Sequence, residues 1–565
     1  MAADIFRITL AQLNPTVGDI NGNAAKAREA RAKAAADGAD LVVLPELFIA
    51  GCPPEDLVLK PAFQSACRAA VEALARETAD GGPAVLIGTP WVGDGRLHNA
   101  CALLDAGRIA ALRFKTNLPD HSLFDERRLF ARGPAAGPVS VRGLRVGVAI
   151  GEDLWLEESK GYENVVETLA ETGAEFIVAP SASPYARGNG DLRLSVAVAR
   201  VIESDMPLVY LNQVGGQDEL VFDGASFALN ADVSVAAQLP AFIEQVTTLD
   251  FERGDDGWRR GPVATLPEGD QADYAACVLG LRDYISKNGF AGVLLGISGG
   301  IDSALCAAIA VDALGCDKVR AFTMSYSDTP QPWQDDAAAL AARLGFSREV
   351  LPIAAAVEGL ERVLSGPLAA DGDDDLLART RGTLLAALAA RSGALAMTTS
   401  NRSDLSIGHA IDGDVGGFAP LKNIAATQAV RLAALRNDWK PVDALGPAGE
   451  VIPPDIFARW SGTQRGKSLP PDDVLDGILA RIEEGQPLAD IVAAGFDRAT
   501  VLRIDQLVAT AEAGRRRAAP GVKLRPRDRR LPITNRFQDD GAPLQAPDDS
   551  LVTRGGRASS EAFEG

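Results

Sequence analysis

Two sets of residues in this sequence combine side-chain types and spacings that could do chemistry. The first is residues 298–303, SGGIDS, which follow the apolar run GVLLGI and precede an apolar, helix-forming stretch. Glycines permit a tight turn, and a helix N-terminus presents backbone N–H groups that favour an anion. The loop lacks the lysine of a P-loop. We expect it to bind phosphates, and the alternative is a glycine-rich connection without a ligand.

The second set of residues would suit the hydrolysis of an amide. Glu46 and Lys115 each follow a strand-like run, and the run RVGVAI stops at Gly151, where a strand-end turn would present a nucleophile. A carboxylate can act as a general base, and an ammonium can stabilise an oxyanion. Glycine, however, has no side chain to attack a carbonyl. Taken singly, Glu46 and Lys115 are equally consistent with surface charges.

The elements that must position these residues follow an α/β pattern in both halves of the chain. Short apolar runs alternate with alanine-rich helical stretches up to about residue 227, and a second such series begins near residue 272. We expect a first domain at 1–243, a linker at 244–271 around the weak strand VTTLDF, a second domain at 272–537 and a disordered tail at 538–565.

The bulk composition favours small-molecule chemistry. The 565 residues exceed what one core organises, so more than one domain is expected. A net charge of −20, from 56 basic and 76 acidic side chains, argues against a nucleic-acid partner and against docking on anionic lipid. The start of the chain does not resemble a signal peptide, and no run of about eighteen apolar residues occurs. We therefore expect a cytoplasmic protein with no membrane partner.

Cysteine and histidine usage limits the chemistry further. The six cysteines lie in mostly apolar contexts without CxxC pairs, and the three histidines are not clustered. This pattern favours buried thiols over disulfides or zinc ligands. It also argues against a histidine-based metal site and against a Ser-His-Asp triad.

Longer stretches of the second half resemble a known family. SGGIDS is similar to the pyrophosphate loop of the ATP pyrophosphatase superfamily, and it is followed by MTTSNRSD at 397–404, GDVGGFAPLK at 413–422 and RRLPITNRF at 529–537. In this order the motifs resemble the synthetase domain of glutamine-dependent NAD synthetases. The resemblance implies a ligase that uses ATP and Mg²⁺ to adenylate the nicotinate carboxylate of deamido-NAD, which ammonia then attacks.

The resemblance also implies roles for individual residues. Thr399 would contact ATP, Asp302 and Asp404 would be magnesium ligands, and Arg379 and Asp414 would lie at the dinucleotide site. Asp404 stands where the family usually has glutamate, and it could instead cap a helix, just as Asp414 could hold a turn. The pyrophosphate loop would use Ser298, Gly299, Gly300, Asp302 and Ser303.

The second half departs from the family at some of these places. Ala426 precedes Thr427 where the family commonly has a lysine that contacts ATP phosphates. The stretch that begins at Trp460, WSGTQRGKSLPP, is shortened and lacks acids expected near the substrate, and the loop after the second strand reads SYSDTPQPW. Removing positioned charges typically costs several kcal/mol of transition-state stabilisation, so these changes would lower turnover.

The first half resembles the nitrilase superfamily, specifically the glutaminase domain fused to NAD synthetases. The resemblance rests on LPELF around Glu46, RFKTNLP around Lys115 and GEDLW from Gly151, with GCPPEDL, FDERR and NQVGGQD in support. It implies a triad of Glu46, Lys115 and a cysteine at position 151. Asp120 and His121 also stand where the family favours Asn and Tyr. Because the nucleophile is missing, we expect an inactive glutaminase half.

The resemblance spans nearly the whole chain and implies its fold class. We expect an α/β protein with an N-terminal nitrilase-like α-β-β-α sandwich and a C-terminal Rossmann-like ATP pyrophosphatase domain. The leading hypothesis is an NAD synthetase that takes free ammonia rather than glutamine. A second is a non-catalytic member with a regulatory or scaffold role that still binds nucleotide, and a third is an amidase or ligase of altered substrate. The resemblance also implies a homo-oligomer.

Overall fold

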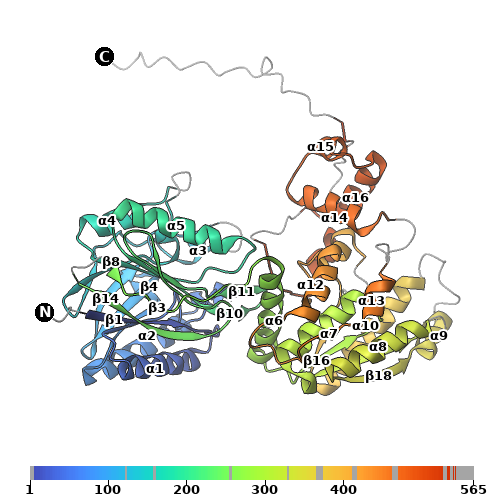
Figure 1. Cartoon of the computed structure of the whole chain (residues 1–565), viewed down its shortest axis with the longest axis horizontal. Helices are drawn as coiled ribbons and strands as arrows, with labels where there is room; N and C mark the ends of the chain where they lie inside the picture. Colours follow the sequence, from blue (N-terminus) through green and yellow to red (C-terminus); the bar gives the residue numbers. More distant parts are fainter. Residues whose placement is uncertain are drawn as a thin grey trace, which may run out of the picture.

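The computed structural model describes residues 5–542 apart from 121–123, 157–160, 254–256, 327–329, 364–372, 410–416, 461–468, 526–530, 535–538 and 540. Two α/β bodies lie side by side, and a small group of helices projects from the second (Figure 1). Among the described residues, no helix is both long enough and apolar enough to span a membrane. Nearly all of the expected tail at 538–565 lies outside the described residues.

The first half contains two large sheets and a separate hairpin. The first sheet has strands β1 (Ile5–Gln12), β2 (Leu41–Val43), β3 (Ala84–Gly93), β4 (Arg96–Asp105), β5 (Arg108–Phe114), β14 (Gln245–Glu252) and β15 (Gly257–Trp258). The second has β6 (Val139–Val141), β7 (Leu144–Val148), β8 (Phe176–Ser181), β9 (Leu208–Asn212), β12 (Phe227–Leu229) and β13 (Val235–Gln238). The hairpin is β10 (Val214–Gln217) and β11 (Leu220–Asp223).

Helices cover both outer faces of this pair of sheets. They are α1 (Ile20–Ala36) and α2 (Pro61–Glu77) on the first sheet, and α4 (Val165–Glu171) and α5 (Asn189–Ser204) on the second. Two shorter elements are α3 (Glu126–Leu129) and the 3-10 turn η3 (Gly151–Leu154). The sheets run β15-β14-β1-β2-β3-β4-β5 and β13-β12-β9-β8-β7-β6. Ile8, Leu86 and Phe176 lie in the core between them, because alternate side chains of each strand face inward. The expected α-β-β-α sandwich is confirmed.

The weak strand VTTLDF expected within the linker 244–271 is β14, and it belongs to the first sheet. β14 pairs with β1 in antiparallel register from Ile5 opposite Glu252 to Gln12 opposite Gln245. Leu249 is buried in the core between the sheets. The connection between the two bodies therefore begins only after β15.

The second half opens with α6 (Gly269–Lys287) and contains one parallel sheet with helices on both faces. Its elements are β16 (Val293–Gly296), α7 (Ile301–Leu314), β17 (Val319–Ser325), α8 (Gln331–Leu344), β18 (Ser347–Pro352), α9 (Ala354–Val363), α10 (Asp373–Ser392), β19 (Leu395–Met397), α11 (Arg402–Ile407), α12 (Ala426–Asp438) and α13 (Pro454–Arg459). The projecting helices are α14 (Asp472–Glu483), α15 (Leu488–Ala493), α16 (Arg498–Thr510) and α17 (Glu512–Arg517).

The strand order β18-β17-β16-β19 determines where a ligand is expected. The chain adds β17 and β18 on one side of β16, then returns to place β19 on the other side. In open α/β sheets, ligands bind at the carboxyl ends of the strands where the order reverses in this way. That point lies between β16 and β19, which are parallel neighbours.

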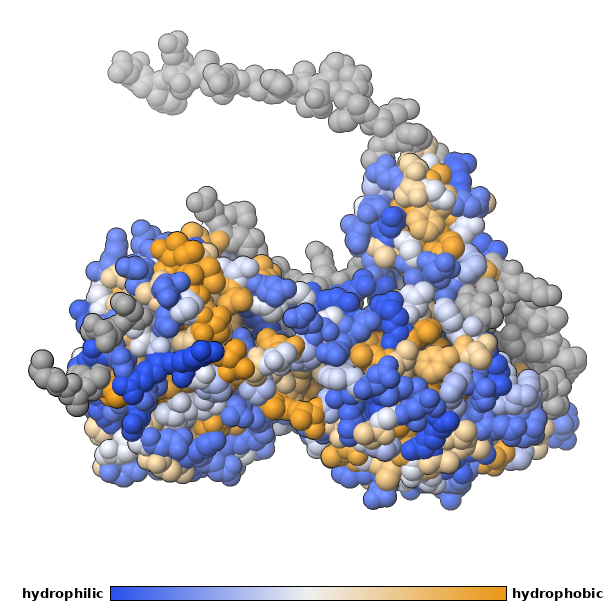
Figure 2. All heavy atoms as spheres, viewed as in Figure 1, coloured by the Kyte–Doolittle hydropathy of each residue, from blue (hydrophilic) through white to orange (hydrophobic). Residues whose placement is uncertain are grey.

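The surface is largely hydrophilic, with an apolar region over the first half near α4 and α5 (Figure 2). Leu192 and Ile202 of α5 are 48% and 69% exposed. Exposed apolar patches of this kind mark places where another surface can dock. The homo-oligomer implied by the resemblance stays a prediction.

Candidate active sites in the two halves

The structure brings Glu46, Lys115 and Gly151 together in one buried site of the first half. Glu46 follows β2, Lys115 follows β5, and Gly151 begins η3 after β7. The Lys115 ammonium donates a hydrogen bond to Glu46 Oε1 at 2.7 Å. A side chain at position 151 would place its Cβ 2.6 Å from Glu46 Oε2 and 3.0 Å from Lys115 Nζ. A carboxylate and an ammonium therefore face the position from which a nucleophile would act.

Backbone contacts of Asp153 hold the turn at Gly151 in place. Asp153 Oδ1 accepts hydrogen bonds from the backbone N–H groups of Thr116 and Asn117, at 2.9 and 2.7 Å. Its other oxygen accepts from Ile150 N at 3.2 Å. Gly151 has φ +52°, in the left-handed region that favours glycine and that other residues adopt at functional turns. The turn thus keeps its shape without any side chain at position 151.

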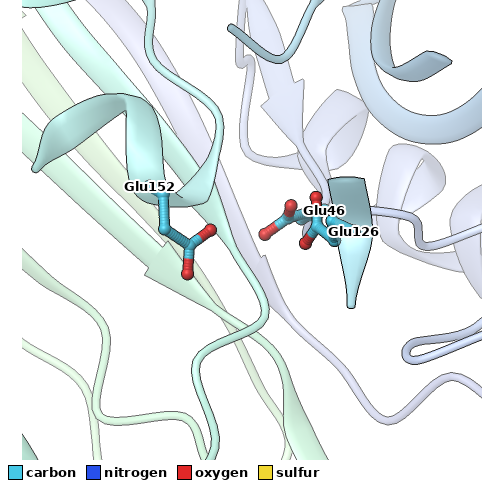
Figure 3. A group of neighbouring side chains, drawn as sticks. All are labelled: Glu46, Glu126 and Glu152. Carbon is cyan, nitrogen blue, oxygen red and sulfur yellow. The ribbon is translucent and has the colours of Figure 1, made fainter. Parts of the chain in front are cut away.

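Two further acids, Glu126 of α3 and Glu152 of η3, complete this site. Glu152 points from its turn toward Glu46 and Glu126 (Figure 3). Lys115 donates to Glu126 Oε1 at 2.9 Å and also to Glu152. Carboxylate oxygens of the three acids lie within 4.8 Å of one another, close enough to hold a metal ion. Lys115 already contacts all three, so its ammonium supplies the positive charge at their centre.

The balance of charge in this cluster decides which groups are ionised. Burial would by itself lower the pKa of Lys115, but the charges of Glu126, Glu152 and Glu46 raise it well above its ordinary value. Burial raises the pKa of Glu46, against the opposing effect of Lys115. Burial also raises the pKa of Glu126 to about 8. Lys115 is therefore charged near neutral pH, while burial makes Glu126 harder to ionise than an exposed glutamate.

Glu126→Gln is expected to make the stability of the protein less dependent on pH. In the unfolded chain a glutamate has a pKa of about 4.3, below that of Glu126 in the fold. Its contribution is therefore fully present below about pH 4.3 and is lost as pH rises toward about 8. Between those pH values, the variant should reduce the slope of the free energy of unfolding against pH by up to about 1.4 kcal/mol per pH unit. Urea unfolding at several pH values measures this slope, and equal slopes in both proteins would contradict it.

Two cysteines that are distant in the sequence lie near this cluster. Burial raises the pKa of the Cys52 thiol well above its ordinary value, and the charge of Glu46 raises it further. Burial and the charge of Glu46 have the same effect on Cys101. The thiolate, not the thiol, is the nucleophile. A raised pKa therefore disfavours the reactive thiolate at both positions.

In the second half, residues 297–300 form a tight loop after β16, and residues 301–303 are the first turn of α7. Gly299 has φ +83°, and a Cβ there would lie 2.5 Å from the Trp333 carbonyl oxygen, so glycine is required. Gly300 N donates to Ser298 Oγ at 3.2 Å, and Ser303 Oγ donates to the Gly300 carbonyl at 2.9 Å. Among the described residues, no side chain caps the start of α7. Its first N–H groups suit an anion such as pyrophosphate.

The other residues that we expected near this loop lie in several parts of the second half. Thr399 is half-buried in the loop after β19, at the same sheet edge as residues 298–303. Asp404 lies in the first turn of α11, where its Oδ2 accepts from Asn401 N at 3.2 Å, so it has the helix-capping role that we considered. Arg379 is exposed on α10, and Asp414 lies outside the described residues.

The position of Ala426 shows what replaces the lysine expected there. Ala426 is buried at the start of α12, and its N–H donates to Ser403 Oγ at 3.0 Å. The next residue, Thr427, donates from N and Oγ1 to Asp476 Oδ2 at 2.9 and 2.7 Å. Asp476 comes from α14 and also accepts from Ser403. The start of α12 is therefore capped by an acid, and position 426 carries no cation toward the phosphates.

Sequence reasoning did not assign Glu126, Glu152, Asp153 or Asn99 to a site. The first three stand inside the motifs FDERR and GEDLW, so a signal for them was present. Asn99 had none, although its Nδ2 donates to Glu46 Oε1 at 2.7 Å. Only the pairing of β4 with its neighbours brings Asn99 next to Glu46.

Comparisons with known proteins cover both halves. The family model described as NAD synthase matches residues 273–518, and the model described as carbon-nitrogen hydrolase matches residues 7–256. The glutamine-dependent NAD(+) synthetase of Rhodobacter capsulatus is 46% identical over 556 residues, covering 95% of this chain and 99% of that protein. That of Xanthomonas campestris pv. campestris is 40% identical over 556 residues, with the same coverage.

A solved structure agrees over both halves as well. The glutamine-dependent NAD+ synthetase from Acinetobacter baumannii, in complex with adenosine diphosphate, is 35% identical and superposes with a TM-score of 0.75. The match covers 95% of this chain and 100% of that one. The two bodies and their order along the chain are therefore shared.

Proposed function

Because this chain belongs to the glutamine-dependent NAD(+) synthetases, a family of ligases, we propose that it forms NAD from deamido-NAD and ATP with ammonia as the nitrogen donor. The observation that carries the choice of donor is Gly151, which has no side chain although it faces Glu46 and Lys115. Glutamine hydrolysis in such a site needs a nucleophilic side chain on that turn. The second half retains the loop and the helix start that phosphate binding requires.

The chemistry can be assigned to atoms of this chain. A nicotinate carboxylate oxygen of deamido-NAD attacks the α-phosphorus of ATP, and pyrophosphate leaves. Ammonia then attacks the activated carbonyl carbon, and AMP leaves. The N–H groups and hydroxyls of residues 298–303 hold the departing pyrophosphate, because they converge at the start of α7. Thr399 contacts the nucleotide from the adjacent strand end.

The acids near this loop fit a magnesium ion. Asp302 lies in the first turn of α7, and Asp404 lies in the first turn of α11 beyond the neighbouring strand. Carboxylate oxygens are the ligands that Mg²⁺ prefers, usually with retained waters and substrate phosphates. The ion would neutralise charge on the phosphates. We include Arg379 and Asp414 in the same proposal as contacts of the dinucleotide.

The experiment that tests this function compares nitrogen donors on the unmodified protein. Incubation with ATP, Mg²⁺ and deamido-NAD should yield NAD, AMP and pyrophosphate when ammonium is added, and no NAD when glutamine replaces ammonium. Nucleotide products are resolved by chromatography. Formation of ADP in place of AMP would rule out attack at the α-phosphorus.

Ala426 favours a second candidate function, a non-catalytic member that binds nucleotide and acts as a regulatory or scaffold subunit. The buried methyl group at the start of α12 offers no charge to the phosphates. Loss of one such positioned charge typically costs several kcal/mol in the transition state. ATP binding without any turnover, with either nitrogen donor, would support this candidate over the first.

A further inference from the structure

The hairpin of the first half, β10 and β11, packs directly against α6 of the second half (Figure 1). Gly216 N donates to Asp283 Oδ2 at 2.6 Å, and Lys287 Nζ donates to the Gly216 carbonyl at 2.7 Å. A Cβ on Gly216 would lie 3.1 Å from the Gly280 Cα. The two backbones approach closely because both contact positions are glycine. The hairpin is therefore fixed to the second half rather than loosely apposed to it.

The turn of this hairpin carries Glu219, which binds two lysines of the second half. Its carboxylate accepts from Lys422 Nζ at 2.6 Å and lies 3.0 Å from Lys523 Nζ. Its backbone carbonyl also accepts from Lys523 N at 2.8 Å. The three side chains are only 18–26% exposed, so the ion pairs are partly shielded from solvent. Such pairs are worth more than those at an open surface.

Lys422 belongs to a segment, residues 417–424, that borders the expected nucleotide site. The Phe418 carbonyl accepts from Thr398 N at 3.0 Å, and the Ile424 carbonyl accepts from Arg402 N at 2.8 Å. These two bonds lie on either side of Thr399 along the chain. The segment therefore supports the loop that carries Thr399 at both of its ends, and Lys422 lies between the two supports.

We propose that Glu219 of the first half is a positioning residue for synthesis in the second half, because it fixes Lys422 and through it the loop that carries Thr399. This inference rests on the proposed function. It gives the first half a role that needs no nucleophile at position 151. The β10–β11 hairpin then serves as part of the wall of the synthetase site, although it belongs to the amidase fold.

Glu219→Gln in the full-length protein tests this role. The variant keeps the shape of the side chain and removes the charge that both lysines contact. With ammonium as donor, kcat/KM for ATP should fall about tenfold, mainly through a higher KM, and the affinity for ATP measured by calorimetry should weaken about tenfold. Glu77→Gln is the matched control, since it removes an ion pair with Arg28 on the surface of the first half. It should change neither quantity.

Lys422→Met is the second arm, because it removes the other partner of the same contact. The two variants should have similar effects, and the double variant should be little worse than either alone. Normal ATP affinity and kinetics in Glu219→Gln, or a change in melting temperature alone, would overturn the inference. If the unmodified protein forms no NAD with ammonium, the proposed function fails, while the calorimetric comparison of ATP binding still decides the role of Glu219.

Discussion

Gly151→Cys is expected to give this protein glutaminase activity, which we propose the unmodified chain lacks. The substitution places a thiol on the turn that faces Glu46 Oε2 and Lys115 Nζ, 2.6 and 3.0 Å from the added Cβ. Glu46 can then take the thiol proton, and Lys115 can stabilise the oxyanion of the tetrahedral intermediate. Removing the nucleophile from a comparable hydrolytic site costs a factor on the order of 10⁶ in rate. Release of ammonia and glutamate from glutamine measures the gain.

The new side chain must displace the Glu46 carboxylate, since 2.6 Å is closer than a Cβ tolerates. That carboxylate is the far end of a flexible chain, so a small rotation relieves the contact. Gly151→Ala is the matched control, because it adds the same Cβ without the sulfur and should leave the protein inactive on glutamine. A Cys variant no more active than the Ala variant would show that the glutamine pocket has changed beyond one residue. Measurable glutaminase activity in the unmodified protein would refute the proposal that the site of the first half is inactive.

Asp302→Ala is expected to lower the rate of ammonium-dependent NAD formation by a factor on the order of 10³. The carboxylate lies in the first turn of α7, beside the expected pyrophosphate position, where it is proposed to bind Mg²⁺. The backbone geometry of the loop depends on Gly299 and on the hydroxyls of Ser298 and Ser303, so it should survive the change. NAD formation at saturating ATP measures the loss.

Two controls separate the loss of the carboxylate at position 302 from a general disturbance of α7. Asp317→Ala removes an exposed acid beyond the other end of the same helix and should leave the rate unchanged. Asp302→Asn keeps the size of the side chain but weakens its binding to a cation, and it should be nearly as inactive as the Ala variant. If Asp302→Ala retained more than about a tenth of the wild-type rate, the proposed role of Asp302 would be wrong.

The sequence was most informative where one short motif defines a complete local structure. SGGIDS contains its own turn glycine and helix start directly after a strand, and the structure shows all three at residues 296–303. GEDLW likewise contains both the turn and Asp153, the acid that fastens it. The local structure of such motifs can be predicted because the contacts that define it join residues close together in the sequence.

Contacts between distant segments were not predictable in the same way. The strand VTTLDF was expected, but it was placed in a linker because its partner β1 stands at the other end of the first half. Asn99 reaches Glu46 only through the order of strands in the sheet. The motif left open whether Asp404 binds metal or caps a helix; the fold shows the helix-capping contact, and the metal role stays a prediction. A motif indicates a residue's position, but each contact also depends on what the fold places beside it.

The way in which Asp153 fastens the turn at residue 151 has a consequence for the living cell. Since the turn is held by three backbone hydrogen bonds to Asp153, a glycine at position 151 leaves no fold defect for chaperones or proteases to recognise. The protein would accumulate to normal levels and look sound in every test of folding. Under the proposed function, a cell that depended on this chain alone would produce NAD at a rate limited by free ammonium, so that nitrogen limitation would also lower the supply of a redox carrier.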